Sequence, residues 1–234
     1  MTGNPPQGGA GGLQGVRLAG PDDVGGALAA LARLLHAGVA PDAVRWHDGL
    51  AVQAGLFDGD ATGTADGESA GGQSTGTSPH DASPGPGLAA PGPPPALPAD
   101  ALALLRPLLL HDDPGRFLLA HQLAQRLHAD PQHWHDRLHP QRLQAERMAR
   151  EVRREIHKMH AFVRFRPVQE PGADAPRHVA WFEPAHHVVR AAAPFFQRRF
   201  AAMHWAILTP RGSLAWDRQA LHAGPPARRE DAPP

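Results

Sequence analysis

The sequence contains no cysteine and no tyrosine among its 234 residues, and a single lysine stands beside 22 arginines. Without cysteine the chain forms no disulfide bond, no thiolate nucleophile and no cysteine-ligated zinc or iron–sulfur centre. No run of about 18 apolar residues occurs, so we predict no membrane-spanning helix and no membrane partner. The opening stretch, MTGNPPQGGAGG, has neither a basic start nor an apolar centre, so no secretory signal is predicted. We therefore expect a cytoplasmic protein.

The formal net charge is zero, but the charges are unevenly distributed along the chain. Residues 1–136 contain 6 basic and 14 acidic residues, whereas residues 137–200 contain 13 basic and 6 acidic ones. A local excess of arginine suits the binding of phosphate groups. The alternative interpretation is an arginine-rich helix face that is simply solvated.

Glycine and proline mark the segments that lack a core. We interpret residues 1–15 as a disordered tail and residues 58–99 as a flexible linker, because 17 of the 42 linker residues are glycine or proline. Such a composition buries too little apolar surface to offset the entropy lost on ordering. Residues 16–57 predict a strand–helix–strand unit, with a strand at 16–20, a helix capped by Asp22 or Asp23, and a strand at 43–48.

Residues 100–220 are predicted to form the main body, and residues 221–234 a second disordered tail. Helical periodicity extends from residue 98 to residue 160, with Pro107 bending or ending the first helix and Asp113 capping the second. Beyond it we expect strands at 161–168 and 177–183, a helix at 184–203 and a hairpin over 204–217. This order predicts an α+β fold, in which an antiparallel sheet with one packed helix follows the helical middle.

The stretch EIHKMHAFVRFRP at 155–167 concentrates cationic and imidazole groups at the predicted helix-to-strand junction. Spacing of four residues aligns three cations on the helix, and spacing of two places one aromatic ring and two arginines on one strand face. Such a surface can hold phosphates while a base stacks on the ring. The alternative is a set of ion pairs with Glu155 or Glu183. The predicted nucleic-acid-binding residues are Arg150, Arg154, Lys158, Phe162, Arg164 and Arg166.

Histidine and glutamate side chains provide a second group of candidates. His157 and His160 are three residues apart, a spacing that can place two imidazoles on one ion. Glu183 and His186 flank a predicted strand-to-helix transition, where a carboxylate and an imidazole can act as acid and base. No HExxH motif occurs and no carboxylate stands at ligand spacing, so we predict no metal and no cofactor. The candidate catalytic residues are His157, His160, Glu183 and His186.

Several stretches of the sequence resemble a bacterial protein family. They are RMAREVRREIHKMHAFVRFR at 147–166, HVAWFEPAHHVVRAAAPFFQRRFA at 178–201 and WAILTPRGSLAWD at 205–217, with weaker likeness in ARLLHAGVAPDAVRW and HDDPGRFLLAHQLAQRL. The family is of unknown function and is described as a probable DNA metabolism or DNA repair protein. Its members neighbour a radical-SAM protein and are often fused to a uracil-DNA glycosylase-like domain. The tyrosine-rich segment that usually follows the final hairpin in this family has no counterpart here.

The residues and the resemblance together leave three hypotheses open. The leading one is an accessory protein of DNA repair that binds DNA through its arginine-rich face. The second is an enzyme that acts on a nucleotide or DNA end with a histidine–glutamate site. The third is a scaffold that docks the radical-SAM or uracil-DNA glycosylase-like partner. The resemblance supplies the DNA-repair context and these two partners, whereas the spacing supplies only the cationic face.

Overall fold

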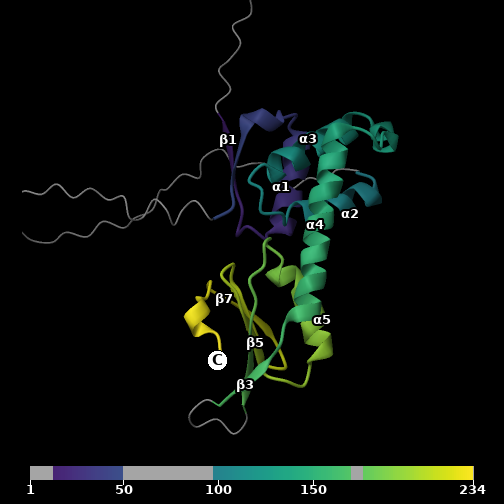
Figure 1. Ribbon diagram of the computed structural model, residues 1–234. Helices are drawn as coiled ribbons and strands as arrows, with labels where there is room; N and C mark the ends of the chain where they lie inside the picture. Colours follow the sequence, from purple (N-terminus) through teal and green to yellow (C-terminus); the bar gives the residue numbers. More distant parts are fainter. Residues whose placement is uncertain (1–12, 50–96, 170–175, 234) are drawn as a thin grey trace, which may run out of the picture.

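The computed structural model describes residues 13–49, 97–169 and 176–233. Most of the predicted N-terminal tail and of the predicted linker lies outside these residues. The described chain forms a helical lobe and a sheet lobe, which one long helix connects (Figure 1). The end of the predicted linker is structured, because Leu97 is buried and Ala99 begins a helix.

The N-terminal unit is a strand, a helix and a strand, as predicted. Its elements are β1 (Gln14–Arg17), α1 (Val24–His36) and β2 (Val44–His47), and the two strands pair in parallel. Asp23 caps the helix, because its Oδ1 accepts the backbone N–H of Gly26 at 2.8 Å. The chain leaves the helix through Gly38, whose φ of 64° suits a residue without a Cβ atom.

Three further helices complete the helical lobe: α2 (Ala99–Leu108), α3 (Arg116–Ala129) and α4 (Pro140–Phe162). Pro107 is the penultimate residue of α2, so the helix ends where the sequence predicted. The predicted cap of α3 is wrong, because Gly115 occupies the N-cap position. Asp113 instead accepts the Gly115 backbone N–H at 2.7 Å and forms the turn that leads into the helix.

The sheet lobe confirms the predicted α+β class. Its strand order is β3-β4-β5-β6-β7, and helix α5 (Val189–Arg199) packs on it. Neighbouring strands are antiparallel except β4 and β5, which are parallel because α5 carries the chain back between them. The strands are β3 (Arg166–Val168), β4 (Arg177–Trp181), β5 (Trp205–Leu208), β6 (Ser213–Trp216) and β7 (Leu221–Gly224).

Several boundaries differ from the sequence prediction. The helix expected at 184–203 is shorter and comprises only Val189–Arg199. The long helix continues to Phe162, and only Arg166–Val168 of the expected strand 161–168 pairs with a neighbour. A short alternating run is also compatible with the last turn of a helix, so the period alone could not fix this boundary. The segment 221–234 was predicted to be a tail, but β7 lies there, because Leu221 packs against the core and its strand pairs with β6.

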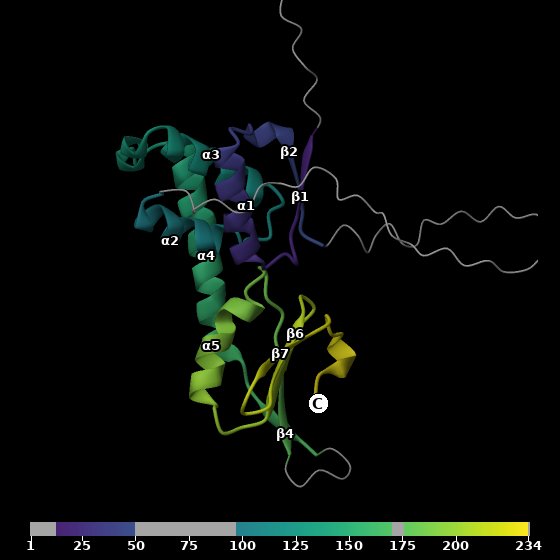
Figure 2. The same ribbon diagram turned by 180° about the vertical axis from the view of Figure 1, so that it is seen from behind.

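The helix α4 belongs to both parts of the core (Figures 1 and 2). Its Ala145 and Met148 pack in the cluster formed by β1, α1, α2 and α3. Its Val152 and Met159 pack in the cluster formed by α5 and the sheet. With 23 residues, α4 is about 34 Å long, enough to span both lobes. No helix in the described part of the chain is long and apolar enough to cross a lipid bilayer.

Candidate functional site

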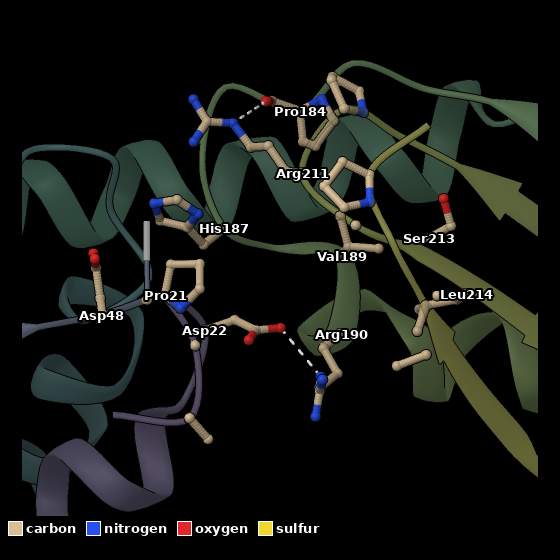
Figure 3. A pocket seen from close by; sticks show the side chains of 18 of the residues that line it. Pro21, Asp22, Asp48, Pro184, His187, Val189, Arg190, Arg211, Ser213 and Leu214 are labelled. Carbon is tan, nitrogen blue, oxygen red and sulfur yellow. Dashed lines mark hydrogen bonds and ion pairs between the residues drawn. The ribbon is translucent and has the colours of Figure 1, made fainter. Parts of the chain in front are cut away.

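A cleft of about 800 Å³ lies where the helical lobe meets the sheet lobe (Figure 3). The segments that follow four strands line it: Gly20 after β1, Asp48 after β2, Glu183 after β4 and Arg211 after β5. These strands form the two parallel pairs of the structure, so both pairs direct their carboxyl ends towards this cleft. In sheets with parallel strands, ligands bind outside the carboxyl ends.

Both arginines that line the cleft are paired with carboxylates. Arg190 of α5 donates its Nε to Asp22 at 3.2 Å, and Arg211 donates Nη1 to Asp112. The side chain of Arg190 is 63% exposed, so this pair is solvated and weak. Burial raises the pKa of Asp112, but the hydrogen bond and charge of Arg211 outweigh it, so the pKa stays below its ordinary value.

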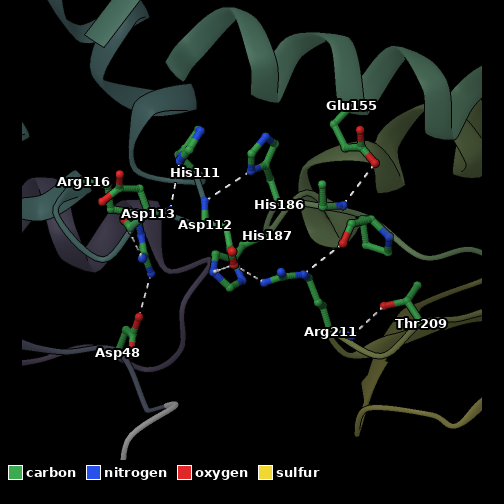
Figure 4. Close-up of polar contacts among 12 residues, drawn as sticks. Asp48, His111, Asp112, Asp113, Arg116, Glu155, His186, His187, Thr209 and Arg211 are labelled. Carbon is green, nitrogen blue, oxygen red and sulfur yellow. Dashed lines mark hydrogen bonds and ion pairs between the residues drawn. The ribbon is translucent and has the colours of Figure 1, made fainter. Parts of the chain in front are cut away.

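Arg116 anchors the wall of the cleft on the helical side. Its side chain is 2% exposed and stacks on Phe117, with the guanidinium carbon 4.2 Å from the ring centre. The guanidinium donates to the Asp48 carboxylate at 2.6 Å and to the carbonyl oxygens of Leu109 and Asp113. Burial is the main influence on its pKa and lowers it. Figure 4 shows how this contact ties the segment after β2 to the segment before α3.

A second network holds the segment between β4 and α5 (Figure 4). The Arg211 Nε donates to the Pro184 carbonyl oxygen at 2.9 Å, and the Glu155 carboxylate of α4 accepts the Ala185 backbone N–H at 3.1 Å. The His187 backbone N–H donates to the Leu110 carbonyl oxygen at 2.9 Å. The segment between β4 and α5 is therefore held from three sides.

His111, Glu151 and His186 bring three potential metal ligand atoms within 4.8 Å of one another. Each histidine, however, accepts a backbone N–H at its Nδ1, from Asp113 at 3.0 Å and from Asp112 at 3.2 Å. An accepting Nδ1 places the proton of a neutral imidazole on Nε2. A histidine that binds metal through Nε2 carries its proton on Nδ1, so this arrangement favours hydrogen bonding over metal binding.

The same cluster perturbs two pKa values. The hydrogen bond from His111 Nε2 to Glu151, at 3.0 Å, lowers the pKa of the Glu151 carboxyl. Burial, followed by the charge of His111, lowers the pKa of His186. The two rings lie 4.2 Å apart, so both cannot become cationic without repulsion.

His187 lines the cleft, and its pKa is strongly lowered. Its side chain is 2% exposed, and neither ring nitrogen has a hydrogen-bond partner in the part of the chain that the structure describes. The nearest carboxylate oxygen, on Asp112, is 3.6 Å from Nε2. Burial and then the charges of Arg116 and Arg211 lower its pKa to about 4, so the ring is neutral near pH 7.

The four candidate catalytic residues lie in different surroundings. His157 is exposed on α4, while His160 stacks on Phe195 at 4.2 Å and has a pKa lowered by burial. Glu183 lines the cleft and accepts the Trp181 indole N–H at 2.7 Å. His186 belongs to the cluster with His111 and Glu151. In the described ranges, no hydrogen bond, ion pair or ring contact joins any two of the four.

A second hollow, which we call the arginine–aromatic groove, has a volume of about 530 Å³. It unites the predicted Phe162, Arg164 and Arg166 with two residues that the sequence analysis missed, Trp181 and Arg229. Phe162 is 66% exposed, and the Arg229 guanidinium lies 5.6 Å from the Trp181 ring centre. Glu230, Ala232 and Pro233 complete the lining.

The three cations predicted on α4 do not line this groove. Arg150 lies beside Arg153 in a separate hollow between α2 and α4, and Arg154 is exposed on the same helix. Lys158 pairs with Glu155 at 3.3 Å. The residues predicted to form one cationic face thus lie in separate places. Of the predicted cations, Arg164 and Arg166 line the groove that contains the aromatic rings.

Comparison with known proteins places the chain in a family. A family model described as a domain of unknown function, DUF4130, matches residues 114–231, just over half of the chain. The chain belongs to the DUF4130 family. The DUF4130 segment includes α3, α4, α5, the whole sheet and every residue that lines the arginine–aromatic groove except Ala232 and Pro233. No curated protein and no solved structure matches the chain.

Proposed function

We propose that this DUF4130 protein binds nucleic acid through the arginine–aromatic groove, as an accessory protein of DNA repair or DNA metabolism. The observation that supports this function best is the exposed Phe162 ring among three arginines in one hollow. The resemblance described above adds the DNA-repair context. From the same resemblance we propose a radical-SAM protein and a uracil-DNA glycosylase-like protein as its partners, in the cytoplasm.

The groove combines the two contacts that single-stranded nucleic acids require. Aromatic rings stack on successive bases, and each stacked base contributes about 1–3 kcal/mol. Phe162 at the end of α4 provides such a ring, which is 66% exposed. Because Arg229 already lies over the Trp181 ring, this ring holds a cation to which a phosphate can bind.

The arginines of the groove can meet phosphates. Arg164 donates Nη1 to the carbonyl oxygens of Ala161 and Val163, which orient the guanidinium without neutralising its charge. Arg166 and Arg229 add two more positive charges, and Glu230 opposes them. We therefore expect about two phosphate contacts, which corresponds to a salt slope near −1.4 on a single strand, at about −0.7 for each contact.

The test is the binding of a short fluorescent single-stranded oligonucleotide to the full chain at several salt concentrations. Arg164→Ala/Arg166→Ala should weaken binding and reduce the salt slope by about one unit. Phe162→Ala should weaken binding about tenfold and leave the slope unchanged, because it removes stacking and no charge. The matched control is Arg150→Ala/Arg154→Ala, which removes two cations from α4 outside the groove.

The outcomes separate the hypotheses. If the control weakens binding as much as Arg164→Ala/Arg166→Ala, the contact is a diffuse charge effect and the groove is not the site. If the wild-type chain binds no oligonucleotide at low salt, the proposal is wrong and the scaffold hypothesis replaces it.

A further inference from the structure

We propose that the cleft between the lobes binds a nucleoside monophosphate, with its phosphate at the N-terminus of α5. This site is separate from the arginine–aromatic groove. The position of the phosphate does not depend on the proposed function, whereas the choice of a nucleotide rests on it.

The start of α5 differs from the start of α1, which also borders the cleft. Asp23 occupies the N-terminus of α1 with its own carboxylate. The N-cap residue of α5 is Val188, which offers no side-chain acceptor, and Val189 and Arg190 of its first turn line the cleft. The first backbone N–H groups of a helix have no acceptor within the helix, and they bind phosphate well.

His187, which directly precedes this helix, provides independent support. His187 lines the cleft (Figure 3) and is 3% exposed, and within the described residues neither ring nitrogen has a hydrogen-bond partner. Buried polar groups in native proteins almost always have a partner, so this ring is suited to a hydrogen bond with a polar ligand or a water molecule in the cleft. A polar ligand at the start of α5 lies next to this ring.

The other cleft residues fit the two halves of a nucleotide. Arg190 and Arg211 approach from different segments, and each can bind a phosphate that displaces its present carboxylate partner, Asp22 or Asp112. The carboxylates that line the cleft, Asp22, Asp48 and Glu183, oppose an anion, so the backbone N–H groups of α5 must contribute to its binding. The volume of about 800 Å³ exceeds what a phosphate needs and suits a ligand with a ring system. Val189, Leu214, Pro210 and several further apolar side chains provide surface for a sugar and a base.

The wall of the cleft and the wall of the groove are in contact. Trp181 lines the groove and Glu183 lines the cleft, and the indole N–H of the first donates to the carboxylate of the second at 2.7 Å. Ala223, Gly224 and Pro226 line the cleft, and a few residues later Arg229 and Glu230 line the groove, so one segment borders both. A strand held in the groove would thus have its terminal nucleotide near the cleft.

Asp22 allows a stringent test of the proposal, because its carboxylate forms an ion pair with Arg190 in this structure. An anionic ligand must compete with Asp22, whereas a cationic ligand would use it. We would titrate the full chain with deoxyadenosine monophosphate and with inorganic phosphate by calorimetry. We expect Arg190→Gln to weaken nucleotide binding about tenfold and Asp22→Asn to strengthen it several-fold. Arg198→Gln, at the other end of α5, is the matched control and should change nothing.

The remaining outcomes overturn the proposal or part of it. Weaker nucleotide binding by Asp22→Asn, or an equal effect of Arg198→Gln, would show that α5 does not hold the phosphate. Equal affinities for inorganic phosphate and the nucleotide would overturn the assignment of the ligand class. Arg164→Ala/Arg166→Ala should leave nucleotide affinity unchanged. Oligonucleotide binding without nucleotide binding defeats this inference alone, and the reverse result defeats the proposed function alone.

Discussion

Arg116 does not line the cleft between the lobes, but it holds one of the residues that do, Asp48, in place. Its guanidinium is almost fully buried and makes three contacts, with a carboxylate 68 residues away and with two carbonyl oxygens close in sequence. These acceptors lie in a fork geometry that a lysine cannot match. The contact holds Asp48, and with it the end of β2, against the segment before α3.

We predict that Arg116→Met destabilises the protein by about 3–5 kcal/mol, because it removes the buried guanidinium that pairs with Asp48 and donates to the Leu109 carbonyl oxygen. Urea unfolding at pH 7 measures the change. Arg106→Met, an exposed position in the last turn of α2, is the control and should cost less than about 0.5 kcal/mol. A loss below about 1 kcal/mol for Arg116→Met would show that water replaces the guanidinium.

At the scale of residues, the sequence could predict neighbours along the chain and little else. Phe162, Arg164 and Arg166 were found because they are adjacent in sequence, and the structure does place them in one groove. Trp181 and Arg229 were missed because β4 and the C-terminal segment reach the groove only through the sheet. No local pattern in the sequence indicates that Asp48 faces Arg116.

At the scale of elements, α4 is the main structural support of the molecule. Helical periodicity up to residue 160 predicted this helix, and the structure buries one face of it at Ala145, Met148, Val152 and Met159. The sequence could not predict which face meets which lobe, because the same stripe serves two clusters. The parallel pairing of β4 and β5 could not be predicted either, because it depends on how α5 packs on the sheet between these two strands.

We predict that Met159→Ala destabilises the protein by about 2–4 kcal/mol, since this fully buried side chain fills the cluster between α4, α5 and the sheet. Leu143→Ala on the same helix, where the side chain is 46% exposed, should cost under about 1 kcal/mol. Thermal unfolding followed by circular dichroism distinguishes the two variants. Similar losses for both would mean that helix propensity, rather than packing, dominates at Met159.

At the scale of the whole molecule, the histidines predict how stability depends on pH. Burial lowers the pKa of His121, His160, His186 and His187, the last to about 4 from an ordinary value of 6.5. The unfolded chain therefore binds more protons than the folded chain between about pH 6.5 and 4. Stability is fully present above pH 6.5 and is lost as the pH falls through this window.

We expect His187 alone to account for up to about 3 kcal/mol of that loss. His187→Leu should flatten the dependence of the unfolding free energy on pH. It should change stability at pH 7 by less than about 1 kcal/mol, because the ring gives up no hydrogen bond. Urea unfolding at pH 7, 6, 5 and 4.5 provides the comparison, with His157→Leu at an exposed position as the control. An unchanged slope for His187→Leu would assign the pH dependence to other groups.

The core shared by α4 has a consequence for where the folding unit begins. The DUF4130 match starts at residue 114, yet the cluster around Ala145 and Met148 also contains Leu31 of α1 and Leu105 of α2, which lie before it. A fragment that started at the family boundary would expose one side of α4 and lose the walls of the cleft contributed by Gly20 and Asp48. The family match thus begins inside the unit that folds cooperatively. The segments before residue 114 complete that unit.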